Sequence, residues 1–275
     1  MNLHLLSNFW VTSQICMPNY LHDKYRMNKK LQLFLLQLVC HITLIYAIFN
    51  FTLSQWLISF FVYFLTGCLG VSVTLHRYYS HKGFEFKYKW VERLCAFFAF
   101  YGVIGDPIAW VNNHRHHHRM TDKEGDPHSP KVYGFWRVQW FSMFYSYDKL
   151  RYVPNMVRDK YLVFLHKYYY VFHWGLMALL IGLNFDVAAT IYLVPAAILW
   201  NAGSFVNTLG HMLGYKNHNT DDSSVNNPIL GYFVWGEGWH NNHHNSPASP
   251  KFGERWFEFD MGLQMIKLIG VDVKV

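Results

Sequence analysis

The 275-residue chain is strongly apolar, with 52% hydrophobic and 19% aromatic residues but only 15% charged residues. Soluble globular domains average about 25% charged residues, so this composition argues against an ordinary soluble protein. The formal net charge of +7 is not accompanied by a recognisable nucleic-acid-binding motif, and we expect no nucleic-acid partner.

Four charge-free apolar runs dominate the chain, at 31–49, 53–75, 168–185 and 187–209. About 20 apolar residues cross a bilayer as an α-helix. The runs therefore predict four transmembrane helices, with spans at about 31–50, 53–75, 165–185 and 187–209. The expected fold class is an all-α integral membrane protein, in which residues 1–275 form a single domain.

The basic residues predict how these spans are oriented. Of the 24 Lys and Arg residues, four precede the first run, fourteen lie between His76 and Lys160, Lys167 lies at the start of the third span, and five follow the fourth run. The short connections after the first and third runs contain none. By the positive-inside rule, both termini and the long central segment face the cytoplasm. We expect a multi-pass protein of the endoplasmic reticulum or a bacterial inner membrane, with a cytosolic helical cap.

Nine histidines and one asparagine occupy four short clusters with recurring spacings. The clusters are His76 and His81; His114, His117 and His118; Asn207 and His211; and His240, His243 and His244. Neutral imidazole is the commonest metal ligand, and residues four apart share one face of an α-helix. Because no cysteine accompanies the histidines, they suit iron better than a structural zinc ion, and nine imidazoles suffice for two ions.

At these clusters the chain resembles the membrane fatty-acyl desaturases, especially the stearoyl-CoA desaturase-like delta-9 branch. Residues 76–81 (HRYYSH) match the HxxxxH box of that family, and residues 113–118 (NHRHHH) contain its first HxxHH box. The Asp-Pro-His segment at 126–128 follows at the usual distance, and Asn207 to His211 matches the NxxxH element. Residues 237–244 (EGWHNNHH) resemble the EGWHNxHH signature. The resemblance covers about residues 30–265.

The resemblance implies oxygen-dependent desaturation of a long-chain fatty acyl substrate, saturated C16 or C18 at the delta-9 position. It implies that the nine histidines bind two iron ions and that Asn207 acts through water, with no catalytic residue beyond the metal centre. Such chemistry needs dioxygen activated by a redox metal, because side-chain acid–base catalysis does not remove hydrogen from an unactivated methylene chain.

Three further residues are candidates for supporting the metal centre. Asp126 and Glu237 would accept the far ring N–H of a ligand histidine and so orient its ring. His128, in the Asp-Pro-His turn, is a candidate for the same supporting role or for an ordinary structural hydrogen bond. His116 matches no box position, and we do not expect it to be a ligand.

The second span suggests where an acyl chain would end. Phe64 and Cys68 are spaced i, i+4 and precede His76 by 12 and 8 residues. At the α-helical rise of 1.5 Å per residue, 8 residues correspond to about 12 Å, close to the roughly 11 Å that the carbons beyond a delta-9 bond require. These two residues are therefore predicted to close the end of the substrate tunnel, unless they only pack against a neighbouring span.

The acyl carrier and the electron donor stay open at this stage. Acyl-CoA is the expected carrier, with acyl carrier protein or a glycerolipid as alternatives. Because the sequence has no haem-binding His-Pro-Gly-Gly segment, we expect a separate donor of the cytochrome b5 or ferredoxin type, with O2 and membrane lipid as further partners. A related di-iron hydroxylase or monooxygenase would release a hydroxylated product instead. A membrane metal transporter, the more distant alternative, would place its ligands near the bilayer midplane.

Overall fold

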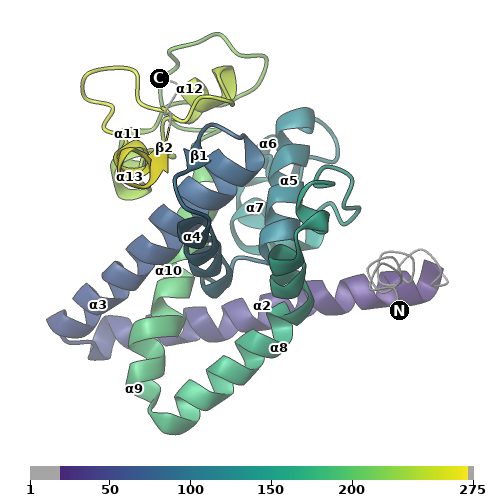
Figure 1. Ribbon diagram of the computed structural model, residues 1–275, viewed down its shortest axis with the longest axis vertical. Coiled ribbons are helices and arrows are strands. Elements are labelled where there is room, and N and C mark those ends of the chain that lie inside the picture. The colour runs from purple at the N-terminus through teal and green to yellow at the C-terminus, as the bar shows by residue number, and fades with distance from the viewer. Residues whose placement is uncertain (1–18, 272–275) are drawn as a thin grey trace.

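A computed structural model describes residues 19–271 of the protein, with side chains from residue 28 to residue 270. The predicted cytoplasmic position of the two termini falls on residues outside this range. Within it the regular secondary structure is almost entirely helical, as expected (Figure 1).

The lower half of Figure 1 consists of long apolar helices. They are α2 (Asn19–Asn50), α3 (Leu53–Tyr63), η1 (Phe64–Ser80), α8 (Lys160–Leu183), α9 (Phe185–Ala188), η4 (Ala189–Leu193) and α10 (Val194–Leu209). Two side-chain caps make the tight turns between them: Thr52 caps α3 in a capping box with Gln55, and Asn184 accepts from the backbone N–H of Val187 at the start of α9. A polar cap at a helix start supplies a partner for backbone N–H groups that the helix cannot satisfy.

Among the described residues, three helical segments are long and apolar enough to cross a membrane: Asn28–Asn50, Leu53–Ser80 and Phe185–Leu209. They coincide with the predicted first, second and fourth spans, although the second extends to Ser80 rather than residue 75. The predicted third span lies in α8, which is helical over 24 residues. Its first half carries Lys160, His166, Lys167 and several tyrosines. Helix α8 is therefore long enough to cross a membrane but less apolar than the three segments above.

The second span changes from α-helix to π-helix at Phe64. The change is visible in hydrogen bonds between residues five apart, such as the bond from the His81 N–H to the His76 carbonyl at 3.2 Å. Helix α4 (Lys89–Tyr101) packs directly against this segment, because a Cβ at Gly70 would lie only 2.4 Å from the backbone nitrogen of Ala99. Glycine at this position permits the close approach.

The remaining elements form a cap above the long helices, in the upper half of Figure 1. They are β1 (Glu85–Phe86), α4, α5 (Pro107–Met120), α6 (Pro130–Tyr133), α7 (Phe135–Phe141), η2 (Ser142–Tyr145), η3 (Met156–Arg158), α11 (Pro228–Phe233), α12 (His240–Asn245), α13 (Met261–Ile269) and β2 (Gly270–Val271). Strands β1 and β2 pair antiparallel, with Glu85 opposite Val271. This short ribbon is a small departure from the predicted all-α fold.

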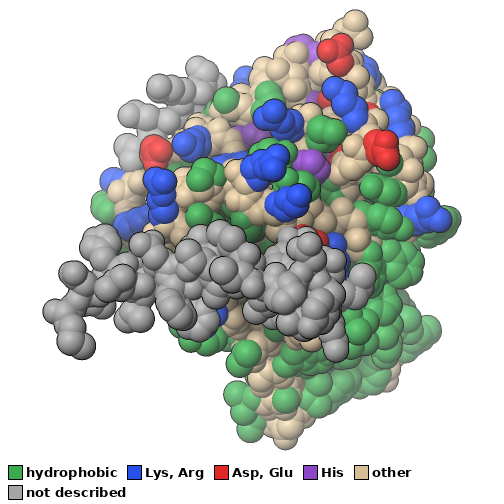
Figure 2. All heavy atoms as spheres, turned by 90° about the vertical axis from the view of Figure 1, so that its right-hand side faces the viewer, with side chains coloured by type: hydrophobic (Ala, Val, Ile, Leu, Met, Phe, Trp, Pro, Cys, Tyr) green, Lys and Arg blue, Asp and Glu red, His purple; other side chains and the backbone are tan. Residues whose placement is uncertain are grey.

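The surface divides in the same way. Figure 2 shows hydrophobic side chains over the lower part of the visible face, with Lys, Arg and His side chains gathered above them. Exposed apolar residues are frequent on the candidate spans, for example Phe49 at 81% exposure and Leu53 at 75%. A soluble protein rarely exposes so much contiguous apolar surface, so this distribution fits a lipid-facing lower body beneath a polar cap.

Candidate metal centre

The nine predicted histidines lie together where the upper ends of η1 and α10 meet the cap, and they form two groups. The first, called the five-histidine group, contains His76, His81, His114, His118 and His243. The second, called the four-histidine group, contains His117, His211, His240 and His244. Within each group the candidate ligand atoms all lie within 4.8 Å of one another, which is the spacing expected around a single ion.

Each HxxHH box contributes to both groups. On α5, the i, i+4 pair His114 and His118 joins the five-histidine group, whereas His117 faces the four-histidine group. On α12 the assignment is reversed, since His243 alone joins the five-histidine group. The i, i+4 residues of each box thus act together, as helical geometry requires, and the middle histidine points to the other group.

Three histidines depend on less regular backbone. His76 and His81 are five residues apart, a spacing that follows the i to i+5 bonds of the π-helical segment. His211 lies beyond the end of α10, where Gly210 turns the chain. A Cβ at Gly210 would lie 2.3 Å from the Val206 carbonyl oxygen, so a larger residue does not fit this turn.

The histidine rings face one another through their Nε2 atoms. The facing pairs are His76 and His243 at 3.0 Å, His81 and His114 at 2.8 Å, His118 and His243 at 3.0 Å, and His211 and His240 at 3.1 Å. The buried Nε2 atoms of His117 and His244 have no hydrogen-bond partner among the described residues. Inward-facing lone pairs repel each other unless a cation lies between them, so this arrangement fits a pair of metal ions.

Burial keeps several of these rings neutral. Burial, reinforced by the neighbouring histidines, lowers the pKa of His81 to about 2 and the pKa values of His114, His118 and His243 well below their usual range. Burial also lowers the pKa of His211 and His240 strongly. A neutral imidazole has a free lone pair, which is the form that binds a metal ion.

Carboxylates hold the outer nitrogens of several rings. The Nδ1 of His76 contacts Glu237, and the Nδ1 of His117 lies 2.9 Å from both oxygens of Asp126. These are the two acidic residues that the sequence suggested as ring-orienting groups. Burial opposes ionisation of both, but the contacts with the histidines lower the pKa of each carboxyl. Both therefore stay ionised and accept from the ring N–H.

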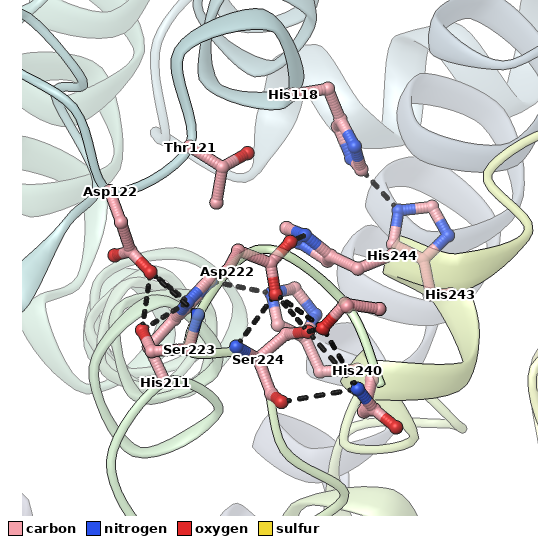
Figure 3. Close-up of polar contacts among 12 residues, drawn as sticks. His118, Thr121, Asp122, His211, Asp222, Ser223, Ser224, His240, His243 and His244 are labelled. Atoms are coloured by element: carbon pink, nitrogen blue, oxygen red, sulfur yellow. Dashed lines mark hydrogen bonds and ion pairs between the residues drawn. The ribbon is translucent and has the colours of Figure 1, made fainter. Parts of the chain in front are cut away.

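Two further acidic residues support the ligand rings and were not predicted from the sequence. Asp222 lies 2.7 Å from the Nδ1 of His244, and Asp122 accepts a hydrogen bond from Ser223, which in turn contacts His211 (Figure 3). The segment around Asp222 belongs to no helix or strand, and no histidine motif includes it. Its run of Asp and Ser beside a histidine-rich chain was the available signal.

The other polar candidates surround the centre without joining either group. The Asn207 side-chain amide donates to His128 Nδ1 at 3.4 Å, and burial lowers the pKa of His128 to about 4. His116 belongs to neither group; its ring nitrogens contact the Gly125 carbonyl at 3.0 Å and the Tyr152 hydroxyl at 3.3 Å. Asn207 and His128 both face a large cavity beside the metal centre.

That cavity has a volume of about 1530 Å³. One part of its lining is the metal centre, with His76, His114, His240 and Glu237. A second part is apolar and includes Ile108, Leu199, Trp200, Val206 and Trp235. A third part is basic, with Lys29, Lys30, Lys149, Arg158, Lys160 and Lys167.

The predicted tunnel end does not lie on the cavity wall. Phe64 and Cys68 pack in a cluster with Leu199 and Trp235, which do line the cavity, so they stand one layer behind it. Gly67 and Val71 are the nearby residues of η1 that reach the wall. The α-helical spacing used for the tunnel estimate does not apply here, because the segment from Phe64 onward is π-helical.

Comparison with known proteins gives one consistent result. The model for the fatty acid desaturase family matches residues 54–252. An acyl-CoA 5-desaturase of Anemone leveillei is 33% identical over 248 residues, covering 86% of this chain and 76% of the relative. A delta-9 acyl-lipid desaturase of Arabidopsis thaliana is 34% identical, with 86% and 80% covered. An sn-2 palmitoyl-lipid 9-desaturase of Nostoc sp. (strain 36) is 32% identical, with 81% and 84% covered.

Proposed function

Because the chain belongs to the fatty acid desaturase family and is a fatty acyl desaturase, we propose that it introduces a delta-9 double bond into a saturated C16 or C18 acyl chain at a di-iron centre. The single observation that carries this proposal is the pair of histidine groups beside a large, largely apolar cavity. Family membership also sets aside the metal-transporter interpretation.

We assign the two ions to the five-histidine and four-histidine groups, with Asn207 acting through water and Asp126 and Glu237 orienting ligand rings. When bound, two iron ions would use O2 and two external electrons to supply an oxidant, and this oxidant would abstract hydrogen from the acyl chain. All nine protein ligands are imidazoles, and outer carboxylates fix the ring positions before substrate arrives. Such preorganisation holds the reacting centre in one geometry throughout the reaction.

The cavity wall positions the substrate. An acyl chain inserted between Trp200, Trp235 and Val206 would bury its methylenes and exclude water from the centre. His76, His114 and His240 line the same cavity, so a chain bound there has only a few carbons next to the metal ligands. Positioning of this kind restricts the reaction to one carbon–carbon bond.

The basic part of the lining supports acyl-CoA as the carrier. Six Lys and Arg side chains from α2, the 149–158 region and α8 line the cavity, and ammonium and guanidinium groups bind phosphate well. Acidic residues offset part of this charge, since Lys30 pairs with Asp148 at 2.9 Å. The relatives include enzymes named for acyl-CoA and for acyl-lipid substrates, so the carrier is a point to test.

For the membrane arrangement, we propose that α8 forms a fourth span beside the three apolar ones, with the histidine-rich cap in the cytoplasm. The first and second spans would then form one hairpin, and α8 and the last span would form another, in the endoplasmic reticulum or a bacterial inner membrane. O2 and a separate donor of the cytochrome b5 or ferredoxin type would complete the reaction.

The test is expression in a host that lacks its own desaturase, followed by mass spectrometry of fatty acids within each lipid class and the acyl-CoA pool. We expect monounsaturated C16 or C18 with the double bond at carbon 9, appearing first in acyl-CoA. A double bond at another carbon contradicts the delta-9 assignment. If the unsaturated chain appears first in one glycerolipid, acyl-CoA is not the carrier. A hydroxylated product would support the monooxygenase alternative.

A further inference from the structure

A polar loop closes the four-histidine group. Residues 220–224 lie between α10 and α11 and contact this group from outside, as Figure 3 shows. The loop is not part of a helix or strand, so its shape depends on side-chain hydrogen bonds rather than on a backbone ladder.

Asp222 is the first contact between the loop and the metal centre. Its Oδ2 accepts from His244 Nδ1 at 2.7 Å. Its Oδ1 accepts from the Thr220 hydroxyl at 2.9 Å and from the backbone N–H of Ser224 at 2.9 Å. Because both oxygens are engaged, the carboxylate is fixed in place. It holds the proton of His244 on Nδ1 and leaves Nε2 free to face the group.

Ser223 is the second contact. The His211 ring donates from Nδ1 to the Ser223 hydroxyl at 3.2 Å, while its Nε2 faces His240. The same hydroxyl donates to Asp122 Oδ2 at 2.5 Å, and the backbone N–H of Ser223 donates to that oxygen at 2.7 Å. A serine anchored at two atoms thus fixes the orientation of the His211 ring.

Asp122 connects this loop to the segment after α5. Its Oδ1 accepts from Ser129 at 2.7 Å, and its backbone N–H donates to Asp126 Oδ2 at 3.0 Å. Its backbone has φ +59°, a left-handed conformation that non-glycine residues rarely adopt. Asp126 in turn holds His117. The outer contacts of three of the four histidines therefore belong to one connected network.

The five-histidine group is held differently. Glu237 is the one carboxylate that contacts it among the described residues, through His76. Its other rings are packed by aromatic side chains: Trp110 stacks on His114 with centroids 5.1 Å apart, and Phe252 lies 4.4 Å from His243. In the part of the chain that the structure describes, no residue of the 220–224 loop forms a hydrogen bond or ion pair with this group, so the loop acts on one half of the centre.

We propose that Asp122, Asp222 and Ser223 are positioning residues of the four-histidine group, and that the 220–224 loop sets how tightly that half holds its metal, independently of the five-histidine half. This inference rests on the proposed di-metal function. Loss of an outer partner of a metal ligand typically weakens metal binding 10- to 100-fold. The variants should therefore release one of two ions selectively.

The experiment measures metal rather than activity. Full-length wild-type protein is purified in detergent with iron, and iron per chain and the time course of iron transfer to a chelator are recorded for Asp222→Asn, Ser223→Ala and Asp122→Asn. Asp221→Asn is the matched control, because it removes the same charge from the adjacent, exposed position. Glu237→Gln is the reciprocal variant for the other half.

We expect wild-type protein to hold about two irons and to release them in two phases. Asp222→Asn should accelerate one phase by 10- to 100-fold, with smaller effects of Ser223→Ala and Asp122→Asn, while Asp221→Asn matches wild type. Glu237→Gln should accelerate the other phase. Size-exclusion profiles and the unaffected phase report that each variant is folded.

Unchanged release kinetics in both Asp222→Asn and Ser223→Ala would overturn the inference, as would acceleration of both phases together. The proposed function fails in a different way. If wild-type protein holds two irons with these kinetics but yields no delta-9 product, the delta-9 proposal is wrong and the loop assignment stands.

Discussion

The two halves of the metal centre use the same ligand, imidazole, but fix it by different physical means. In the five-histidine group, rings from π-helical and α-helical segments pack against Trp110 and Phe252. In the four-histidine group, Asp126, Asp222 and the Asp122–Ser223 pair hold ring nitrogens through hydrogen bonds from loops. Packing spreads its contribution over many contacts, whereas each hydrogen bond rests on one atom pair. The loop-held half should therefore be sensitive to single polar substitutions at more positions.

The largest effect is expected when a ligand is removed from either half. His118→Ala takes a ring from the five-histidine group, and His244→Ala takes one from the four-histidine group. If both metals are needed to activate dioxygen, each variant should lose desaturation completely and at least one iron per chain. Elemental analysis and fatty acid mass spectrometry measure the two losses. Full activity in either variant would contradict the assignment of that histidine.

The next effect compares hydrogen bonding with packing inside one half. Glu237→Gln removes the carboxylate on His76 and leaves the buried Arg77 guanidinium with Asp260 as its remaining carboxylate partner. Metal affinity of the five-histidine half should fall about 10- to 100-fold. Phe252→Leu keeps an apolar side chain against His76 and His243 and should change affinity only a few-fold. Metal titrations of the two variants test the comparison, and equal losses would show that packing matters as much as the carboxylate.

A smaller effect is expected on product length, from residues outside both halves. A Cβ at Gly203 meets no atom within 4 Å, and Gly203 lines the cavity, so Gly203→Leu should fill the cavity and shift products toward shorter chains. Cys68→Leu should do the same indirectly by pressing on Leu199 and Trp235, at a stability cost of about 1–3 kcal/mol. Phe64→Ala should admit longer chains. The C16-to-C18 product ratio is the measurement, and unchanged ratios in the Cys68 and Phe64 variants would place the tunnel end elsewhere.

The smallest effect should come from His116, the histidine between the residues that supply both halves. It contacts the Gly125 carbonyl and Tyr152 and stacks on Tyr147 rather than facing either group. His116→Ala should retain substantial desaturation and both irons, whereas His117→Ala should abolish activity. Equal loss in the two variants would show that the HxxHH register assigned to residues 114–118 is wrong.

The sequence by itself identified the nine histidines, the family and the apolar spans, because these depend on local information. Ligands that recur at i, i+4 are recognisable wherever the helix lies, and a charge-free run of about 20 residues is recognisable without its neighbours. Asp126 and Glu237 were also found, since each lies next to or within a histidine motif.

Only the tertiary structure decided which histidine belongs to which half and what holds it there. Asp122 and Ser223 are 101 residues apart in the chain, and no periodicity links them. The π-helical backbone that brings His76 and His81 together coincides with a close approach of α4 at Gly70, which helical spacing does not reveal. The same backbone placed Gly67 and Val71, rather than Phe64 and Cys68, on the cavity wall. Contacts between distant segments depend on how whole elements pack, and local sequence patterns do not encode that packing.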